Sequence, residues 1–174
     1  MSTPMPTFEE TLDFIRNDAH AGVMDKGGIP YWQHPLRVAT NVGILFPELA
    51  EDEEVLIAAL LHDVLEDTEC DYSGLITDGY THRTLDICWW LDKNNIHYRD
   101  MTYLQKIEHL AAHGPTEALQ VKYADLTDNS DDRRGYVLPI SQKVKYDKAM
   151  TILETALDER DLEASKEAYA EATK

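Results

Sequence analysis

Apolar side chains recur along this chain at intervals of three and four residues, the spacing of one face of an α-helix. No segment shows the convincing apolar–polar alternation that is typical of a half-buried strand. Gly, Pro and polar clusters interrupt the pattern, notably at 25–30, near Gly74 and Gly79, and at 131–139. The chain is therefore predicted to be all-α, with helices over about 7–24, 35–46, 53–67, 82–91, 102–112, 117–129 and 141–157.

Several helix starts can be predicted from capping residues. Thr7 precedes Glu10 by three positions, which is the spacing of a capping box. Asp52 and Thr81 each precede a helical segment and are typical N-caps. Pro35 falls in a first turn, where its missing N–H costs nothing.

Length and composition indicate one globular domain. The chain has 174 residues, of which 43% are hydrophobic and 28% charged. We predict one domain over residues 1–157 and an acidic tail over 158–174, either a solvated helix or a frayed end. There is no apolar run long enough to cross a membrane and no secretory signal, so we expect a cytoplasmic protein. Cys70 and Cys88 lack metal-ligand spacing and are predicted to be free thiols.

The formal charge of −17 disfavours a nucleic-acid surface, which needs basic side chains to meet phosphates. An anionic substrate would need a local cation. A metal ion therefore becomes more important if the ligand is a phosphate. The sequence does not fix an oligomeric state.

The densest chemistry lies at 58–68, where an apolar helical run ends in acidic residues and a histidine. On a continuous helix His62 would share a face with Glu66, and Asp63 with Asp67, so these side chains would converge. Burying such a cluster is costly unless protons or a cation compensate. The alternative is a helix end that surfaces with solvated acids.

Three separate segments supply side chains that commonly ligate metals: His34, the pair His62 and Asp63, and Asp125. Two imidazoles with two carboxylates suit Mn²⁺, Fe²⁺, Co²⁺ or Zn²⁺, and the set lacks the thiolates of a closed zinc site. Taken singly, a histidine before proline is more often a helix-start residue, and an aspartate near a helix end is usually solvated. The prediction of a metal centre depends on the whole set.

The order His34, His62-Asp63, Asp125 resembles that of the HD phosphohydrolase superfamily. The fuller match is to its alarmone-hydrolase branch, which includes the hydrolase domains of the RelA/SpoT proteins and the small alarmone hydrolases. It is carried by three segments: Ala19 to Ala39 with its Tyr31-x-x-His34-Pro35 run, Ala58 to Thr68, and Lys122-x-Ala124-Asp125-Leu126-x-Asp128-Asn129.

This resemblance implies a single HD-domain helical bundle that binds one Mn²⁺ and removes the 3′-pyrophosphate from guanosine tetra- and pentaphosphate. The partner would be a small-molecule nucleotide. The matching positions imply metal ligands at His34, His62, Asp63 and Asp125, and a catalytic pair at Glu66 and Asp67 that activates or orients water. They also imply substrate contacts at Lys26, Asn129 and Tyr146.

One position departs from the family pattern. Asp25 stands where many members carry an arginine that stacks on guanine, and it is expected to bring negative charge to the pocket and weaken base discrimination. The alternatives are therefore an HD phosphohydrolase acting on an adenosine alarmone, NADPH or a nucleoside phosphate, and a non-catalytic, antitoxin-like binding protein. Arg133 and Arg134 follow Asn129 closely and either reach phosphates or pair with Asp131 and Asp132.

Overall fold

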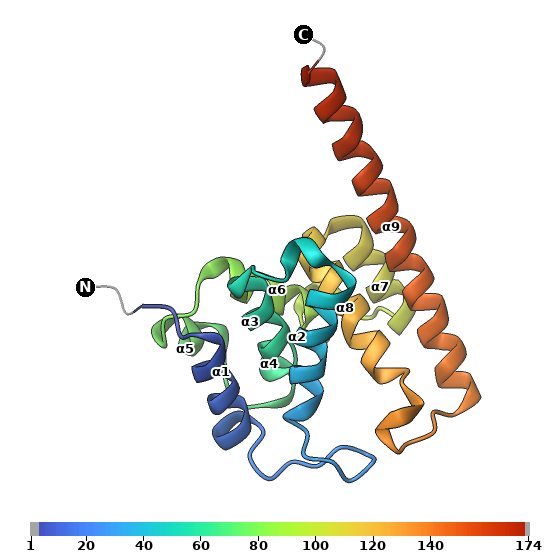
Figure 1. Ribbon diagram of the computed structural model, residues 1–174. Coiled ribbons are helices and arrows are strands. Elements are labelled where there is room, and N and C mark those ends of the chain that lie inside the picture. The colour runs from blue at the N-terminus through green and yellow to red at the C-terminus, as the bar shows by residue number, and fades with distance from the viewer. Residues whose placement is uncertain (1–3, 173–174) are drawn as a thin grey trace.

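The computed structural model describes residues 4–172, and across this part of the chain the fold is all-α, as predicted (Figure 1). Its α-helices are α1 (Phe8–Phe14), α2 (Gln33–Leu45), α3 (Glu53–Leu61), α4 (Val64–Asp67), α5 (Tyr72–Thr77), α6 (His82–Leu91), α7 (Tyr103–His113), α8 (Thr116–Asn129) and α9 (Ile140–Ala172). A π-helical turn, Ile15–Ala19, continues α1, and 3₁₀ turns lie at Pro47–Leu49, Ile96–Tyr98 and Asp132–Arg134. Extended pairing within 4–172 is limited to an isolated bridge between Met24 and Pro30.

Helix α3 forms the centre of the bundle because it is apolar on nearly every side. Almost no surface is exposed at Val55 or at any residue from Ile57 to Leu61. Helix α2 packs extensively against α3 and α8, α6 packs against α3, and α7 and α9 pack against each other beside α8. Figure 1 shows α9 as a long outer helix whose last turns extend away from the bundle. The core therefore holds the ends of α2, α3 and α8 in fixed relation.

The predicted caps are confirmed. Thr7 and Glu10 form a capping box, with the Glu10 backbone N–H donating to Thr7 Oγ1 at 3.3 Å and the Thr7 N–H donating to Glu10 Oε2 at 2.8 Å. Asp52 accepts a hydrogen bond from the Val55 N–H at 3.3 Å and caps α3. Thr81 caps α6. Local side-chain chemistry therefore sets where these helices begin.

Three predicted segments differ from the structure. The first helix ends at Ala19 rather than near Met24, because the chain turns at His20 and Gly22 adopts a positive φ of 72°. The third does not run unbroken to residue 67, because a turn at 62–63 separates α3 from α4. The connection marked by Gly74 and Gly79 contains a short helix, α5, capped by Asp71, whose Oδ1 accepts from the Gly74 N–H at 2.7 Å.

The last predicted helix is twice as long as expected. Helix α9 continues past Leu157 without a break, and Arg160 ties it to α7 and α8 by donating to the Ala111 carbonyl at 2.8 Å and to Thr116 Oγ1 at 3.0 Å. The side chains from Asp161 to Glu171 are exposed, and the helix continues to Ala172, so a solvated helix rather than a frayed end is observed. Residues 173–174 of the predicted tail lie outside the described part, and the boundary at 157 stays a prediction.

Both cysteines are free thiols, as predicted. Cys88 is buried against the Ala58 carbonyl, and burial raises the pKa of its thiol. Among the described helices, none combines the length and the apolar character needed to cross a membrane.

Candidate active site

Three helices bring the four predicted metal ligands to one point. His34 lies in the first turn of α2, His62 and Asp63 follow α3, and Asp125 lies on α8. Asp125 Oδ1 is 3.2 Å from His34 Nε2 and 3.7 Å from His62 Nε2. Asp63 Oδ2 is 3.6 Å from His34 Nε2 and 3.0 Å from His62 Nε2. Two imidazole nitrogens and two carboxylate oxygens therefore converge, as the sequence predicted.

The turn between α3 and α4 explains how two consecutive residues can serve one site. On a continuous helix, neighbouring side chains diverge by about 100°. Here Asp63 has φ −100° and ψ −5°, and its carboxylate comes back to the Nε2 atom of His62. The predicted proximity of Asp63 and Asp67 is retained, with carboxylate oxygens within 4.8 Å, and the turn adds the contact between His62 and Asp63.

Each histidine is held through its other ring nitrogen. His34 Nδ1 lies 2.7 Å from Asp128 Oδ2, and His62 Nδ1 lies 2.8 Å from the Ala59 carbonyl oxygen. Both Nδ1 atoms therefore carry hydrogen and donate, so each ring aims its Nε2 atom at the shared point. Asp63 Oδ2 lies 3.0 Å from His62 Nε2 but not in the direction of a hydrogen bond, so this buried nitrogen has no hydrogen-bond partner. An orphaned imidazole nitrogen aimed at two carboxylates fits a divalent transition metal.

The charges of the cluster are strongly coupled. Burial alone would lower the pKa of His62, but the carboxylates of Asp63 and Asp125 raise it to about 9. The pKa of His34 is likewise raised well above its usual range by hydrogen bonds to Asp125 and Asp128, despite burial. Against the effect of burial, the histidines hold the pKa of Asp63 well below the usual range, and Lys122 together with the histidines does the same for Asp125. Protons therefore compensate the acids here, and a bound cation would take over that task.

Three residues of this shell had no predicted role. Asp128 accepts from His34 and also from Arg37 Nε at 2.6 Å. Lys122 Nζ lies 2.8 Å from Asp125 Oδ2, and the Tyr31 hydroxyl donates to Asp63. All three lie within the segments that carry the family resemblance. Lys122 and Asp125 are three positions apart on α8, a spacing at which helical side chains meet, whereas Asp128 and Tyr31 reach partners that are distant in the sequence.

The predicted catalytic pair lies beside the cluster. Carboxylate oxygens of Asp63, Glu66 and Asp67 all lie within 4.8 Å of one another. Glu66 forms an ion pair with Lys93, while Asp67 Oδ1 is 3.7 Å from Lys93 Nζ. Burial and the neighbouring Asp63 raise the pKa of Asp67. A raised pKa suits a carboxylate that has to take up a proton near neutral pH.

A cavity of about 610 Å³ opens onto this cluster. Its walls include all the predicted substrate-contact residues, which are Lys26, Asn129 and Tyr146, and three further lysines, which are Lys93, Lys106 and Lys122. Four carboxylates, those of Asp63, Glu66, Asp67 and Asp125, line the same cavity, so the lysines offset the acids there, in a chain whose net charge is −17. With a divalent cation on the cluster, the balance of charge in the cavity would become positive and would suit an anionic ligand.

The polar ends of two of these residues are already oriented. Asn129 Nδ2 donates to Asp125 Oδ1 at 2.6 Å, and its Oδ1 accepts from Arg134 at 2.7 Å. The Tyr146 hydroxyl accepts from Gln142 Nε2 at 2.7 Å.

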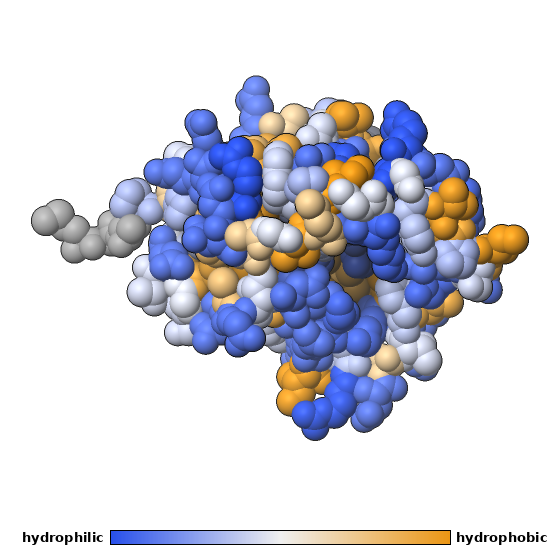
Figure 2. All heavy atoms as spheres, turned by 90° about the horizontal axis from the view of Figure 1, so that it is seen from below, coloured by the Kyte–Doolittle hydropathy of each residue, from blue (hydrophilic) through white to orange (hydrophobic). Residues whose placement is uncertain are grey.

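Figure 2 shows that hydrophilic side chains dominate the face of the molecule seen from below, with hydrophobic side chains dispersed among them.

Asp25 does not bring free negative charge to the pocket. Its Oδ1 accepts from the backbone N–H of Gly27 at 2.8 Å and of Ile29 at 2.9 Å, and its Oδ2 lies 3.4 Å from the guanidinium of Arg134. These contacts outweigh burial and lower the pKa of Asp25. The side chain therefore closes the loop that carries Lys26, and Asp25 also lines a neighbouring cavity of about 300 Å³.

Of the two arginines after Asn129, Arg133 follows the ion-pair alternative and Arg134 has partners that neither alternative named. Arg133 pairs with Asp131 at 2.6 Å and is almost fully exposed. Arg134 is largely buried and contacts Asn129, Asp25 and Asp128. Arg134 therefore joins the 25–30 loop to the end of α8.

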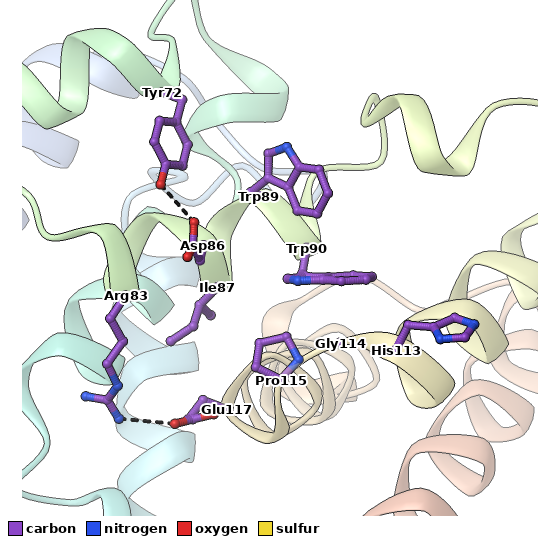
Figure 3. A pocket seen from close by; sticks show the side chains of 10 residues that line it. All are labelled: Tyr72, Arg83, Asp86, Ile87, Trp89, Trp90, His113, Gly114, Pro115 and Glu117. Carbon is purple, nitrogen blue, oxygen red and sulfur yellow. Dashed lines mark hydrogen bonds and ion pairs between the residues drawn. The ribbon is translucent and has the colours of Figure 1, made fainter.

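A second, more open groove of about 980 Å³ lies on the far side of Trp90 (Figure 3). In Figure 3 its charged groups are already paired, Arg83 with Glu117 and Asp86 with Tyr72. Its described lining includes none of the predicted metal or catalytic residues. The residues with predicted metal-binding and catalytic roles thus gather at the cavity of about 610 Å³.

Comparison with known proteins agrees with this geometry. The family model "HD domain" matches residues 31–130. The bifunctional (p)ppGpp synthase/hydrolase SpoT of Escherichia coli strain K12 is 43% identical over 61 residues, and guanosine-3′,5′-bis(diphosphate) 3′-pyrophosphohydrolase of Aquifex aeolicus is 47% identical over 58 residues. These matches cover 35% and 33% of this chain, and each spans only 8% of the relative's length.

A solved structure gives a fold likeness over nearly the whole chain. It is described as a metazoan ortholog of SpoT that hydrolyzes ppGpp, and its superposition has a TM-score of 0.68 at 23% sequence identity. The match covers 91% of this chain and 96% of the other. At this level of identity the likeness establishes the shared fold.

Proposed function

The chain belongs to the HD domain family, and from that membership we propose that it is a metal-dependent nucleotide phosphohydrolase that removes the 3′-pyrophosphate from (p)ppGpp-type alarmones. The observation that carries the proposal is the buried His62 Nε2, which has no hydrogen-bond partner and faces the same point as His34 Nε2 and two carboxylates. A purely structural domain has no use for so costly a cluster.

The proposed metal ligands are His34, His62, Asp63 and Asp125, and Mn²⁺ is the proposed ion because the set mixes nitrogen and oxygen donors. When bound there, a divalent cation supplies Lewis-acid chemistry to phosphate oxygens and lowers the pKa of water. The Tyr31 hydroxyl and Asp128 keep two of the ligands in place.

The protein's own side chains would handle the proton and the phosphate charge. In the proposed reaction a water oxygen bonds to the phosphorus attached to the 3′-oxygen, and that P–O bond breaks. Asp67 takes the proton from the water, with Glu66 as its neighbour, and the departing 3′-oxygen gains a proton. The products are the nucleoside 5′-diphosphate or 5′-triphosphate, with a free 3′-hydroxyl, and pyrophosphate. Lys26 and Lys122 line the cavity where the phosphates would lie and offset their charge.

The proposed substrate contacts follow the same reasoning. Lys26, Asn129 and Tyr146 lie at the junction of this cavity with a smaller one of about 300 Å³, and both cavities include all three residues in their lining. The smaller cavity also contains Tyr136 and Leu138, whose apolar surfaces suit a nucleobase. A cytoplasmic location stays a prediction.

A substrate panel tests the proposal. Purified protein with Mn²⁺ would be given guanosine and adenosine nucleotides that carry a 3′-pyrophosphate, together with NADPH and ordinary nucleoside triphosphates, and the products separated by anion-exchange chromatography. We expect pyrophosphate from the 3′-pyrophosphorylated nucleotides. Turnover confined to NADPH or to the triphosphates would contradict the proposed substrate class, and no turnover of any compound would favour a binding protein.

A further inference from the structure

The turn after α6 places one lysine directly beside the Glu66 and Asp67 pair. Asp92 Oδ1 accepts from the Asn94 N–H at 2.8 Å, and the buried Asn95 donates to the Trp89 carbonyl at 2.9 Å. These bonds fix the backbone at 92–95. Lys93 therefore projects from an ordered turn at the cavity wall.

Lys93 holds both carboxylate oxygens of Glu66. Its backbone N–H donates to Glu66 Oε2 at 3.2 Å, and its ammonium group contacts Oε1. Two further bonds tighten the arrangement, from Asn94 Nδ2 to the Glu66 carbonyl at 3.4 Å and from Lys106 Nζ to the Lys93 carbonyl at 2.8 Å. The Glu66 side chain is 12% exposed.

Asp67 is left in a different state. Its Oδ1 lies 3.7 Å from Lys93 Nζ, beyond hydrogen-bond distance, and its side chain is 42% exposed. The two neighbouring carboxylates are therefore not equivalent: the oxygens of Glu66 already accept hydrogen from Lys93, while Asp67 faces the cavity.

We propose that Lys93 is a positioning residue that occupies both carboxylate oxygens of Glu66, so that Asp67 alone serves as the general base. The proposal deepens the function proposed above and rests on it. Carboxylate oxygens of Asp63, Glu66 and Asp67 already lie within 4.8 Å of one another, so without this clamp the oxygens of Glu66 would be free to turn toward the site. They would then compete for the water and for the cation, because a carboxylate is itself a good metal ligand.

A double-mutant cycle separates this role from direct phosphate binding. Lys93→Met should lower kcat for ppGpp about tenfold, the low end of what the loss of an orienting partner costs, while KM changes little. In a Glu66→Gln background the same substitution should have almost no effect, because no charge remains to be restrained. Lys93→Arg should recover most of the activity. Lys166→Met is the matched control, since Lys166 is similarly exposed and also pairs with a glutamate, Glu163, but on α9.

The same cycle is also measured without substrate, by urea unfolding. The clamp predicts that the shift in unfolding midpoint of the double variant is smaller than the sum of the single shifts. Additive midpoints would overturn the clamp. A Lys93→Met effect that falls on KM and persists in the Glu66→Gln background would instead show direct phosphate binding. If the wild type does not turn over ppGpp at all, the proposed function fails, and the unfolding cycle still decides whether Lys93 restrains Glu66.

Discussion

Asp128 is the residue outside the ligand set on which metal affinity is expected to depend most. It is buried, with 3% of its side chain exposed, and it accepts from His34 Nδ1 at 2.7 Å and from Arg37 Nε at 2.6 Å. Losing the hydrogen-bond partner of a metal-binding histidine typically costs 10–100-fold in metal affinity, or about 1.4–2.8 kcal/mol. Asp128→Asn keeps an acceptor but removes the charge, and charge-assisted bonds are about twice as strong as neutral ones.

The expected loss is therefore graded: about tenfold for Asp128→Asn and about a hundredfold for Asp128→Ala. Titration calorimetry with Mn²⁺ measures both. Asp131→Asn is the control, since Asp131 lies three positions on and pairs with the exposed Arg133 instead of with a histidine. Urea unfolding of each variant checks that the fold persists. If both Asp128 variants are folded and bind Mn²⁺ as tightly as the wild type, the inferred role of Asp128 in fixing His34 is wrong.

Three further predictions concern other parts of the site. First, metal binding needs neutral imidazoles, whereas the carboxylates raise the pKa of His62 to about 9. Mn²⁺ affinity should therefore weaken as pH falls below that value. Calorimetry in buffers of different ionisation enthalpy should show that protons are released when Mn²⁺ binds. Absence of proton release at neutral pH would contradict this reading. Second, Asp67→Asn should slow hydrolysis by roughly 10²–10⁴-fold with metal content unchanged, and wild-type turnover would exclude Asp67 as the base. Third, a Cβ on Gly27 would lie 2.5 Å from the Arg134 carbonyl oxygen, so Gly27→Ala should cost about 1–3 kcal/mol of stability by overpacking and should raise KM. Gly74→Ala is the control, because its Cβ would meet only Asp71 Oδ1 at 3.4 Å. Equal urea midpoints for the two variants would refute the close approach at Gly27.

Much of the fold could be predicted from local chemistry. Capping by Thr7, Asp52 and Thr81 and the helical spacing of apolar residues located most helix starts, because these signals lie within a few residues of one another. Helix ends were harder to predict. The early stop at Ala19 and the extension of α9 to Ala172 depend on a turn and on contacts of Arg160 with distant helices.

The candidate site could also be predicted only in part. The family resemblance and the residue types pointed to His34, His62, Asp63 and Asp125, and the structure brings them together. Their convergence through a break after α3 was not predicted, because the apolar run before His62 favours an unbroken helix.

Supporting residues that are distant in the sequence could not be predicted from spacing. Lys93 reaches Glu66 across 27 positions, and Arg134 reaches Asp25 across 109. Such pairs exist only in the folded chain. Asp25 lines the smaller cavity, as expected of a pocket residue, but its hydrogen bonds to the loop backbone and its ion pair with Arg134 could not be predicted from the sequence.

The most direct measurement is hydrolysis of ppGpp by protein freed of metal with EDTA and then supplied with Mn²⁺, with His62→Ala run in parallel. Products are separated by anion-exchange chromatography. We predict GDP and pyrophosphate in equal amounts from the wild type after Mn²⁺ is restored, and negligible product from the metal-free protein and from His62→Ala, because His62 supplies the unpartnered nitrogen of the cluster. Undiminished turnover without metal and in His62→Ala, or release of orthophosphate in place of pyrophosphate, would contradict it.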